Sequence, residues 1–211
     1  YDTVYREWKH DIKVSGTNLI IDGKEIKFIS EKDATKLPWK DLGVDVVVES
    51  TGLFTSFEKS KVHLDAGAKK VVITAPSKDS DGTVAGETIL LGVNEEKFGT
   101  CDITSNASCT TNAASPLIAI LDESLGIEKA ILNTVHGYTA SQALVDGPSK
   151  KDLREGRAAA QNIVPSSTGA AIAVTKAFTK LAGLFDGISV RVPVPAGSIV
   201  DITFISKKET N

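Results

Sequence analysis

Methionine is absent from the 211 residues of this chain. Because translation starts at methionine, we expect a chain that has been processed, truncated or only partly recorded. Long apolar runs are absent too. The longest, residues 117–121, falls well short of the roughly 18 residues that span a membrane, so we expect no membrane partner.

Cysteine is scarce, and this bears on the compartment. Cys101 and Cys109 are too few and too close in sequence for a disulfide scaffold. Residues 1–11 alternate charged and aromatic side chains where a signal peptide needs an apolar core. We therefore expect a cytoplasmic protein in a reducing environment.

An excess of basic charge is also missing. Lys and Arg number 24 against 27 for Asp and Glu, which gives a net charge of −3. This balance argues against a general nucleic-acid binder. A hydrophobic content of 41% with 24% charged residues is typical of a folded soluble protein.

The first half of the chain shows the pattern of a βαβ unit. Short β-favouring runs separated by turn residues predict an antiparallel region over Lys9–Ser30. The apolar run Val44–Val48 predicts a parallel strand buried on both faces. Helical spacing over Ser56–Ala66 and a second apolar run, Val71–Thr74, complete the unit, which implies a right-handed parallel crossover.

The second half repeats the alternation with different chemistry. We expect a helix over Thr110–Leu125 and a long polar loop over Tyr138–Pro165. A loop of this length inside a compact domain is usually functional or a linker. The expected strands are Asp102–Ser105, Ala130–Val135, Ile188–Val192 and Ile199–Ile205.

Cys109 is the candidate nucleophile. It follows Ser108 at a predicted strand-to-helix turn, where unpaired N–H groups and the helix dipole favour a thiolate. His136 ends the next predicted strand and could supply the base that activates such a sulfur. On spacing alone, a buried structural cysteine and a surface histidine remain an equal alternative.

Several groups suited to anion binding accompany this pair. Hydroxyls and glycines at predicted turns, including Ser166 and Ser167, can offer O–H and N–H donors, and Arg191 interrupts a strand of valines. Taken singly, each could be a helix cap or a solvated residue; together they suggest two oxyanion sites near one thiolate. The set is Ser108, Thr110, Thr139, Thr168, Gly169 and Arg191.

Longer motifs make the sequence recognisable. Residues 105–112, SNASCTTN, resemble the active-site signature of the glyceraldehyde-3-phosphate dehydrogenase family. The resemblance continues through residues 136–139, 146–148, 162–171 and 191–193. It covers essentially the whole chain.

The resemblance implies a role for each candidate. Cys109 would attack an aldehyde with His136 as base, hydride would pass to NAD, and phosphate would release the resulting thioester as an acyl phosphate. Thr139 and Arg191 would bind the phosphate of glyceraldehyde 3-phosphate. Ser108, Thr110, Thr168 and Gly169 would bind the attacking phosphate.

The resemblance also implies a cofactor and an assembly. Thr51, Gly52 and Thr74 would contact the cofactor, at the carboxyl ends of parallel strands. Pro148 stands where NAD-preferring members carry proline, which favours NAD over NADP. The loop over Tyr138–Pro165 would pack near a neighbouring cofactor, which implies a homotetramer.

Departures from the family pattern set the expected boundaries. No G-x-G-x-x-G occurs, so residues 1–108 are predicted as an NAD-binding domain whose N-terminal βαβ is missing. Residues 109–211 are predicted as a catalytic domain whose C-terminal part is missing. The expected fold class is α/β, with a partial Rossmann-type parallel sheet and a catalytic α+β domain with a mixed, largely antiparallel sheet.

Two alternatives stay open. One is a relative that oxidises erythrose 4-phosphate and hydrolyses the thioester; the other is a non-catalytic fragment or binding module on the same fold. No metal site is predicted. Cys101 is expected to be a spectator thiol, and His10, His63 and the charged run Lys150–Arg157 are expected to be solvated.

Overall fold

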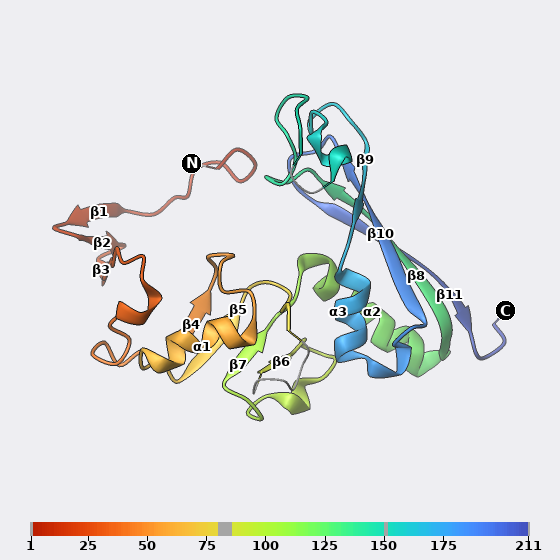
Figure 1. Cartoon of the computed structure of the whole chain (residues 1–211), viewed down its shortest axis with the longest axis horizontal. Helices are drawn as coiled ribbons and strands as arrows, with labels where there is room; N and C mark the ends of the chain where they lie inside the picture. Colours follow the sequence, from red (N-terminus) through yellow and green to blue (C-terminus); the bar gives the residue numbers. More distant parts are fainter. Residues whose placement is uncertain (1, 80–85, 150–151, 211) are drawn as a thin grey trace.

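The computed structural model describes residues 2–79, 86–149 and 152–210, which form three sheets arranged along the long axis of the molecule (Figure 1). The sheet nearest the N-terminus is antiparallel and confirms the antiparallel region expected over Lys9–Ser30. Its strands are β1 (Ile12–Ser15), β2 (Asn18–Ile21) and β3 (Lys24–Ile26).

The central sheet is parallel throughout. Its order is β4 (Val46–Glu49), β5 (Lys70–Ile73), β7 (Ile103–Ser105) and β6 (Gly86–Thr88). The predicted βαβ unit is confirmed, because β4 and β5 pair in parallel on either side of helix α1 (Phe57–Asp65). The sequence did not predict β6.

Capping residues set both ends of helix α1. The Ser56 hydroxyl accepts from the Lys59 N–H at the start, and Gly67 follows the last turn with φ +106°. Fully buried Phe57 packs on Val71, Ile73 and Ile103 of the sheet.

The opposite face of this sheet corrects one expectation. Val46 and Val48 are 51% and 61% exposed, whereas Val47 is buried. Burial on both faces of the first parallel strand was therefore wrong for the residues that the structure describes. A run of valines fits a half-buried strand as well as a fully buried one, and the sequence alone cannot separate the two.

The third sheet is mixed and largely antiparallel, as predicted. Its order is β11 (Ser198–Ser206), β8 (Ile127–Gly137), β10 (Phe185–Val192) and β9 (Val164–Ser167). Only β8 and β10 run parallel to each other among these strands. Ser166 and Ser167, expected in a turn, lie in β9.

Two helices, α2 (Cys109–Ser124) and α3 (Ala170–Ala177), cover one face of the third sheet (Figure 1). Ala114 and Ile118 from α2 and Val174 from α3 pack with Leu132 of the sheet, and all four are fully buried. At about 25 cal/mol per Å² of apolar surface, this core anchors both helices. Their N-terminal ends are thereby fixed against the sheet.

Between β8 and β9 the chain forms the long loop expected over Tyr138–Pro165. Among its described residues, the one regular element before β9 is a short 3-10 turn over Leu153–Gly156, and the last two residues of the expected loop, Val164 and Pro165, already lie in β9. In the charged run expected to be solvated, Lys150 and Lys151 lie outside the described residues. Arg154 and Arg157 are exposed and pair with Asp152 and Asp146.

Lys176 of α3 joins the second and third sheets. Its Nζ donates to the carbonyls of Ser77 and Asp79, at 3.2 and 2.9 Å, in the loop that follows β5. The loop that follows β5 is therefore held against the C-terminal end of α3.

Candidate active site

The turn before α2 fixes where the Cys109 side chain projects. Ala107 is buried and takes a left-handed conformation with φ +59°, which non-glycine residues rarely adopt. The Asn112 side-chain amide donates to the carbonyls of Asn106 and Ser108, and the Ser108 hydroxyl caps the Thr111 N–H. Cys109 is thus the first residue of the helix, with an exposed side chain.

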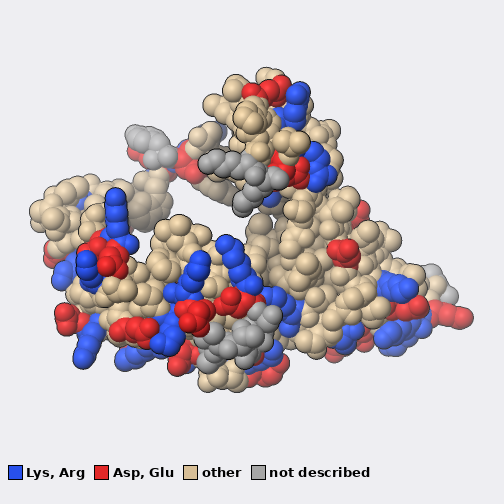
Figure 2. All heavy atoms as spheres, in the orientation of Figure 1, with Lys and Arg blue, Asp and Glu red and all other residues tan. Residues whose placement is uncertain are grey.

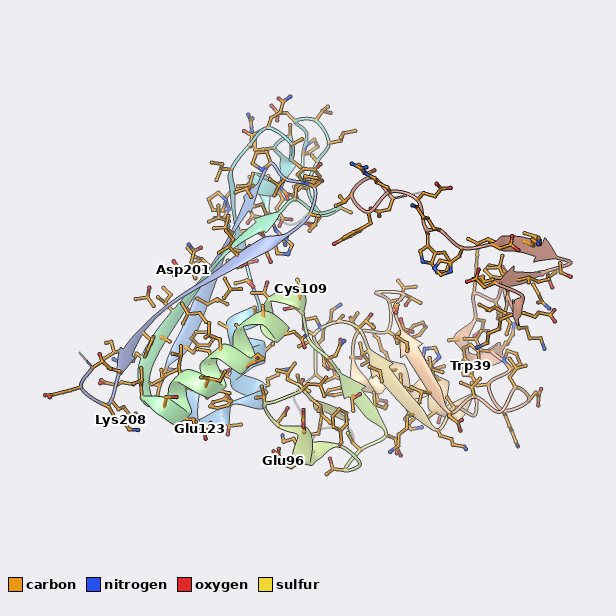
Figure 3. The ribbon with its side chains drawn as sticks, turned by 180° about the vertical axis from the view of Figure 1, so that it is seen from behind. Trp39, Glu96, Cys109, Glu123, Asp201 and Lys208 are labelled. Carbon is orange, nitrogen blue, oxygen red and sulfur yellow. The ribbon has the colours of Figure 1, made fainter. Side chains whose placement is uncertain are left out.

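His136 and Cys109 meet across this turn. The Cys109 Sγ lies 3.5 Å from the His136 Nε2, and the two residues come from α2 and β8. The sequence left open whether these residues were merely structural and apart; the structure brings them within contact. Figure 3 shows Cys109 at the end of α2 nearer the parallel sheet, opposite the end that carries Glu123.

The other ring nitrogen of His136 has two competing partners. Its Nδ1 lies 2.7 Å from the Gly137 carbonyl oxygen, an acceptor, and 2.7 Å from the Arg191 guanidinium, a donor. One tautomer can satisfy only one of them. A proton on Nδ1 leaves Nε2 free to accept from the thiol, whereas a proton on Nε2 points toward the sulfur.

A pocket of about 180 Å³ surrounds this pair. It is small enough for a short metabolite and smaller than the roughly 300 Å³ at which drug-sized ligands begin to fit. Of the predicted site residues, it is lined by Ser108, Cys109, Thr110, His136, Thr168, Gly169 and Arg191.

Two helix N-termini open onto this pocket, those of α2 at Cys109 and α3 at Ala170. The first N–H groups of each helix lack intrahelical partners and carry partial positive charge. With the Arg191 guanidinium, they make a pocket that favours anions.

The remaining predicted residues lie outside the pocket lining. Thr139 follows β8, and its hydroxyl contacts that of Ser141 at 3.1 Å. Thr51 and Gly52 follow β4, and Thr74 follows β5. The predicted cofactor contacts therefore gather at the carboxyl ends of two neighbouring parallel strands, where dinucleotides bind in open α/β sheets.

No cluster of three or more potential metal-binding His, Cys, Asp or Glu side chains occurs in residues 2–79, 86–149 and 152–210. Within those same ranges, no helix is both long and apolar enough to cross a bilayer.

Comparison with protein families separates the two halves of the chain. Residues 1–57 match the model of the glyceraldehyde 3-phosphate dehydrogenase NAD binding domain, and residues 108–211 match that of the C-terminal domain. The chain belongs to the glyceraldehyde-3-phosphate dehydrogenase family.

Relatives from fungi are similar over nearly the whole chain. Glyceraldehyde-3-phosphate dehydrogenase B of Aspergillus oryzae is 49% identical over 203 residues, which is 96% of this chain and 59% of the relative. Glyceraldehyde-3-phosphate dehydrogenase 1 of Trichoderma koningii is 51% identical over the same shares. The enzyme of Eremothecium gossypii is 48% identical over 100% of this chain and 62% of the relative. The chain thus spans about three fifths of these relatives.

The structure adds pocket residues that the sequence analysis missed. Pro76, Thr134 and Ser189 line the same cavity, together with Ser167 from the expected run of hydroxyls. Thr134 is 1% exposed, and its hydroxyl has no hydrogen-bond partner among the described residues. Side chains alternate between the two faces of a strand, so Thr134 and His136 of β8 lie on the same face. This period of two could have identified Thr134 from the sequence.

His63 corrects a further expectation. It was expected to be solvated on a charged helix, but it is only 4% exposed. Its Nε2 lies 2.8 Å from the Glu49 carboxylate, which is buried to the same degree. The charged residues around His63 in sequence occupy the outer face of α1, and the helical period places the histidine on the inner face.

Proposed function

We propose that this chain carries the catalytic centre of an NAD-dependent, phosphorylating glyceraldehyde-3-phosphate dehydrogenase. The observation that carries the proposal is the contact of the Cys109 Sγ with His136 at the N-terminus of α2. Family membership supports it.

Cys109 acts as the nucleophile. With the proton of His136 on Nδ1 and donated to the Gly137 carbonyl, Nε2 accepts the thiol proton. The thiolate then attacks the aldehyde carbon, and the carbonyl oxygen becomes the thiohemiacetal oxygen that His136 stabilises and later deprotonates. Loss of hydride leaves a thioester, and phosphate attacks its carbonyl carbon to release the acyl phosphate and the thiolate.

Two sets of residues hold the two phosphates in this proposal. Arg191 and Thr139 bind the phosphate of the substrate. When Arg191 turns to that phosphate, its guanidinium leaves Nδ1 of His136, so the Nδ1 proton pairs with Gly137 alone. Ser108, Thr110, Thr168 and Gly169 hold the attacking phosphate at the two helix N-termini.

The residues present fit the nicotinamide cofactor. Gly52 has φ +74°, and a Cβ built there would meet no atom within 4 Å, so the turn is open for a ligand. Thr51, Gly52 and Thr74 would hold NAD, which supplies the hydride acceptor when bound. We propose NAD over NADP because of Pro148, which borders a separate surface pocket.

We propose a domain boundary between Ser108 and Cys109. Ser108 caps α2, and the third sheet and its two covering helices all follow it. Residues 1–108 then form the NAD-binding part and residues 109–211 the catalytic part.

Self-association has a surface to use. The face of the third sheet opposite α2 and α3 exposes Ile131, Ile188, Ile199 and Ile205 on three neighbouring strands. Acidic and basic side chains are interspersed over the lower part of the molecule in Figure 2. Polar residues such as Asn133 and Asp201 lie between these isoleucines on the same face. Exposed apolar residues rimmed by polar ones are typical of a subunit interface, and we propose a homotetramer.

We also place the protein in the cytoplasm. Both cysteines are free, and Cys109 is exposed as a proposed thiolate nucleophile. Such a thiol persists in its reactive form in a reducing compartment.

An absorbance assay at the NADH band on the full-length protein tests the proposal. Glyceraldehyde 3-phosphate, NAD and inorganic phosphate should give NADH, and omission of phosphate should stop turnover after one equivalent. Sustained turnover without phosphate, with erythrose 4-phosphate preferred, would favour the alternative dehydrogenase. Absence of both cofactor binding and turnover would favour a binding module.

A further inference from the structure

A buried chain of hydrogen bonds lies behind the Thr51–Gly52 turn. The Trp39 indole Nε1 lies 3.3 Å from the His63 Nδ1, and the His63 Nε2 lies 2.8 Å from the Glu49 Oε2. The other carboxylate oxygen, Oε1, accepts from the N–H of Thr51 at 2.7 Å and from its hydroxyl. These hydrogen bonds therefore link Trp39, which lies outside the sheet, to Thr51, a proposed cofactor-binding residue.

The direction of each proton follows from the tryptophan. An indole N–H can only donate, so the His63 Nδ1 must accept. The ring proton of His63 is then on Nε2, where it donates to Glu49. Glu49 in turn accepts all three of its side-chain hydrogen bonds, as an ionised carboxylate does.

Glu49 also reaches the second cofactor strand. Its main-chain carbonyl accepts from the N–H and the hydroxyl of Thr74, at 3.0 and 3.1 Å. One buried residue thus holds the chain at the ends of both β4 and β5. Trp39 lies on the side of the parallel sheet away from Cys109, so this cluster is separate from the catalytic pocket (Figure 3).

The Thr51 hydroxyl is occupied by this arrangement. It donates to Glu49 and accepts from the Leu53 N–H at 3.1 Å. The turn therefore offers a ligand mainly its main chain, whose geometry depends on where Thr51 is held. Gly52, at φ +74°, gives the turn no Cβ that would stiffen it.

We propose that Glu49 and His63 are positioning residues for the cofactor. They act through Thr51: the tautomer set by Trp39 fixes His63, His63 fixes the carboxylate, and the carboxylate fixes the Thr51–Gly52 main chain. This inference rests on the proposed function only in assigning the turn to NAD.

Glu49→Gln breaks the chain at a predictable point. The amide has one donor end and one acceptor end, and His63 donates from Nε2 as long as Trp39 donates to Nδ1. The Gln oxygen must then face His63, which turns its NH2 toward the N–H of Thr51 and removes that acceptor. We expect the dissociation constant for NAD to rise about tenfold, the size of one lost hydrogen bond.

Trp39→Phe should rescue this variant. Without the indole, the His63 Nδ1 lacks a partner in either tautomer, so its proton is free to move to Nδ1. Nε2 then accepts from the Gln NH2, and the Gln oxygen returns to Thr51. NAD affinity of Glu49→Gln/Trp39→Phe should come within about threefold of Trp39→Phe alone, a non-additive cycle.

The experiment measures NAD affinity and amide hydrogen exchange over residues 49–54 in the full-length protein. Exchange at Thr51 should accelerate in Glu49→Gln and slow again in the double variant. Asn94→Ala is the matched control: Asn94 is a buried polar residue that bonds Leu90 and Thr88 at the far edge of the sheet. It should leave NAD affinity and exchange at Thr51 unchanged.

The outcomes separate the inference from the proposed function. Additive loss in the double variant, or unchanged NAD affinity in Glu49→Gln, overturns the positioning role. If wild-type protein does not bind NAD, the proposed function fails, while the exchange pattern still decides whether Trp39 and His63 control the Thr51 turn.

Discussion

Two histidine sites in this chain differ in how completely their polar groups are paired. In the Cys109 pocket, the hydroxyl of Thr134 and the Nε of Arg191 are buried without hydrogen-bond partners among the described residues, and Nδ1 of His136 has two competing ones. Around Glu49, each carboxylate oxygen and both nitrogens of His63 have partners.

This difference indicates that the two sites have different functions. An unpaired buried polar group costs about 1–3 kcal/mol, and such a cost is expected where a ligand supplies the missing partner. A fully paired cluster is rigid and suits the support of a neighbouring turn. We therefore expect changes in the Cys109 pocket to alter the rate of the chemical step, and changes around Glu49 to alter the affinity for the cofactor.

The largest effect should come from removing the sulfur of the pocket. Cys109→Ser should lower kcat by roughly 10⁴-fold or more, because a serine hydroxyl is a far weaker nucleophile than a thiolate. Steady-state NADH production measures it. Cys101→Ser is the matched control, since Cys101 is buried and its Sγ donates to the carbonyl of Ile103 at 3.3 Å. Activity that survives in Cys109→Ser contradicts the assigned nucleophile.

Removing the pocket histidine should have the next largest effect. His136→Asn should reduce kcat by about 10²–10⁴-fold, the usual contribution of a general base, with the KM for NAD nearly unchanged. Glu49→Gln should show the reverse pattern, with the KM for NAD raised and kcat preserved. If both variants changed the same constant, the comparison between the two sites would fail.

Thr134→Val tests whether the unpaired hydroxyl serves a ligand. Because the hydroxyl has no partner, its loss should leave the free energy of unfolding unchanged or raise it by about 1 kcal/mol. The KM for phosphate should rise about fivefold to tenfold. Ser60→Ala removes a buried hydroxyl that donates to the Phe54 carbonyl at 2.7 Å. This variant should instead have its free energy of unfolding reduced by about 1 kcal/mol. Equal stability losses would show that pairing does not distinguish the sites.

The smallest effect concerns a fully paired site at the other end of α2. Burial alone would raise the pKa of Asp122, but hydrogen bonds from Lys180 and the Ile127 N–H, with the charge of Lys207, lower that pKa overall. Lys180 is mostly exposed, so Lys180→Met should reduce the free energy of unfolding by only about 1 kcal/mol at neutral pH.

The pH dependence of that loss has a definite sign. The native pKa of Asp122 lies below its unfolded value of about 3.9. The stabilisation is therefore complete above the unfolded pKa and disappears as pH falls through the native one. Urea unfolding at pH 7 and below pH 4 measures it. If the stability difference between Lys180→Met and the wild type persisted at the lowest pH, Lys180 would stabilise α2 by packing and not by its charge. Turnover of Lys180→Met should equal that of the wild type at pH 7.

Much of this arrangement follows from local sequence pattern. The β4–α1–β5 unit, the caps at Ser56 and Ser108 and the strand that carries His136 all come from short-range periodicity and capping chemistry. The motif around Cys109 and the later motifs at His136, Thr168–Gly169 and Arg191 named seven of the residues that line the pocket. Pattern fails where partners are distant in sequence: the burial of His63 depends on Glu49 and Trp39, which lie 14 and 24 residues away.

Exposure on a sheet face is likewise a tertiary property. Val46 and Val48 are the same residue type as the buried Val47. Which of these valines is covered depends on the packing of α1 against one face of the sheet. The left-handed turn at Ala107 was also invisible, because alanine gives no local signal for positive φ.

Mass spectrometry of the covalent intermediate tests whether Cys109 is the nucleophile. The full-length protein is mixed with glyceraldehyde 3-phosphate and NAD without phosphate, quenched in acid and digested. We expect a phosphoglyceroyl thioester on the peptide that contains Cys109, lost on addition of phosphate and absent from Cys101. NADH formation with no adduct on Cys109, or an adduct on Cys101, would contradict it.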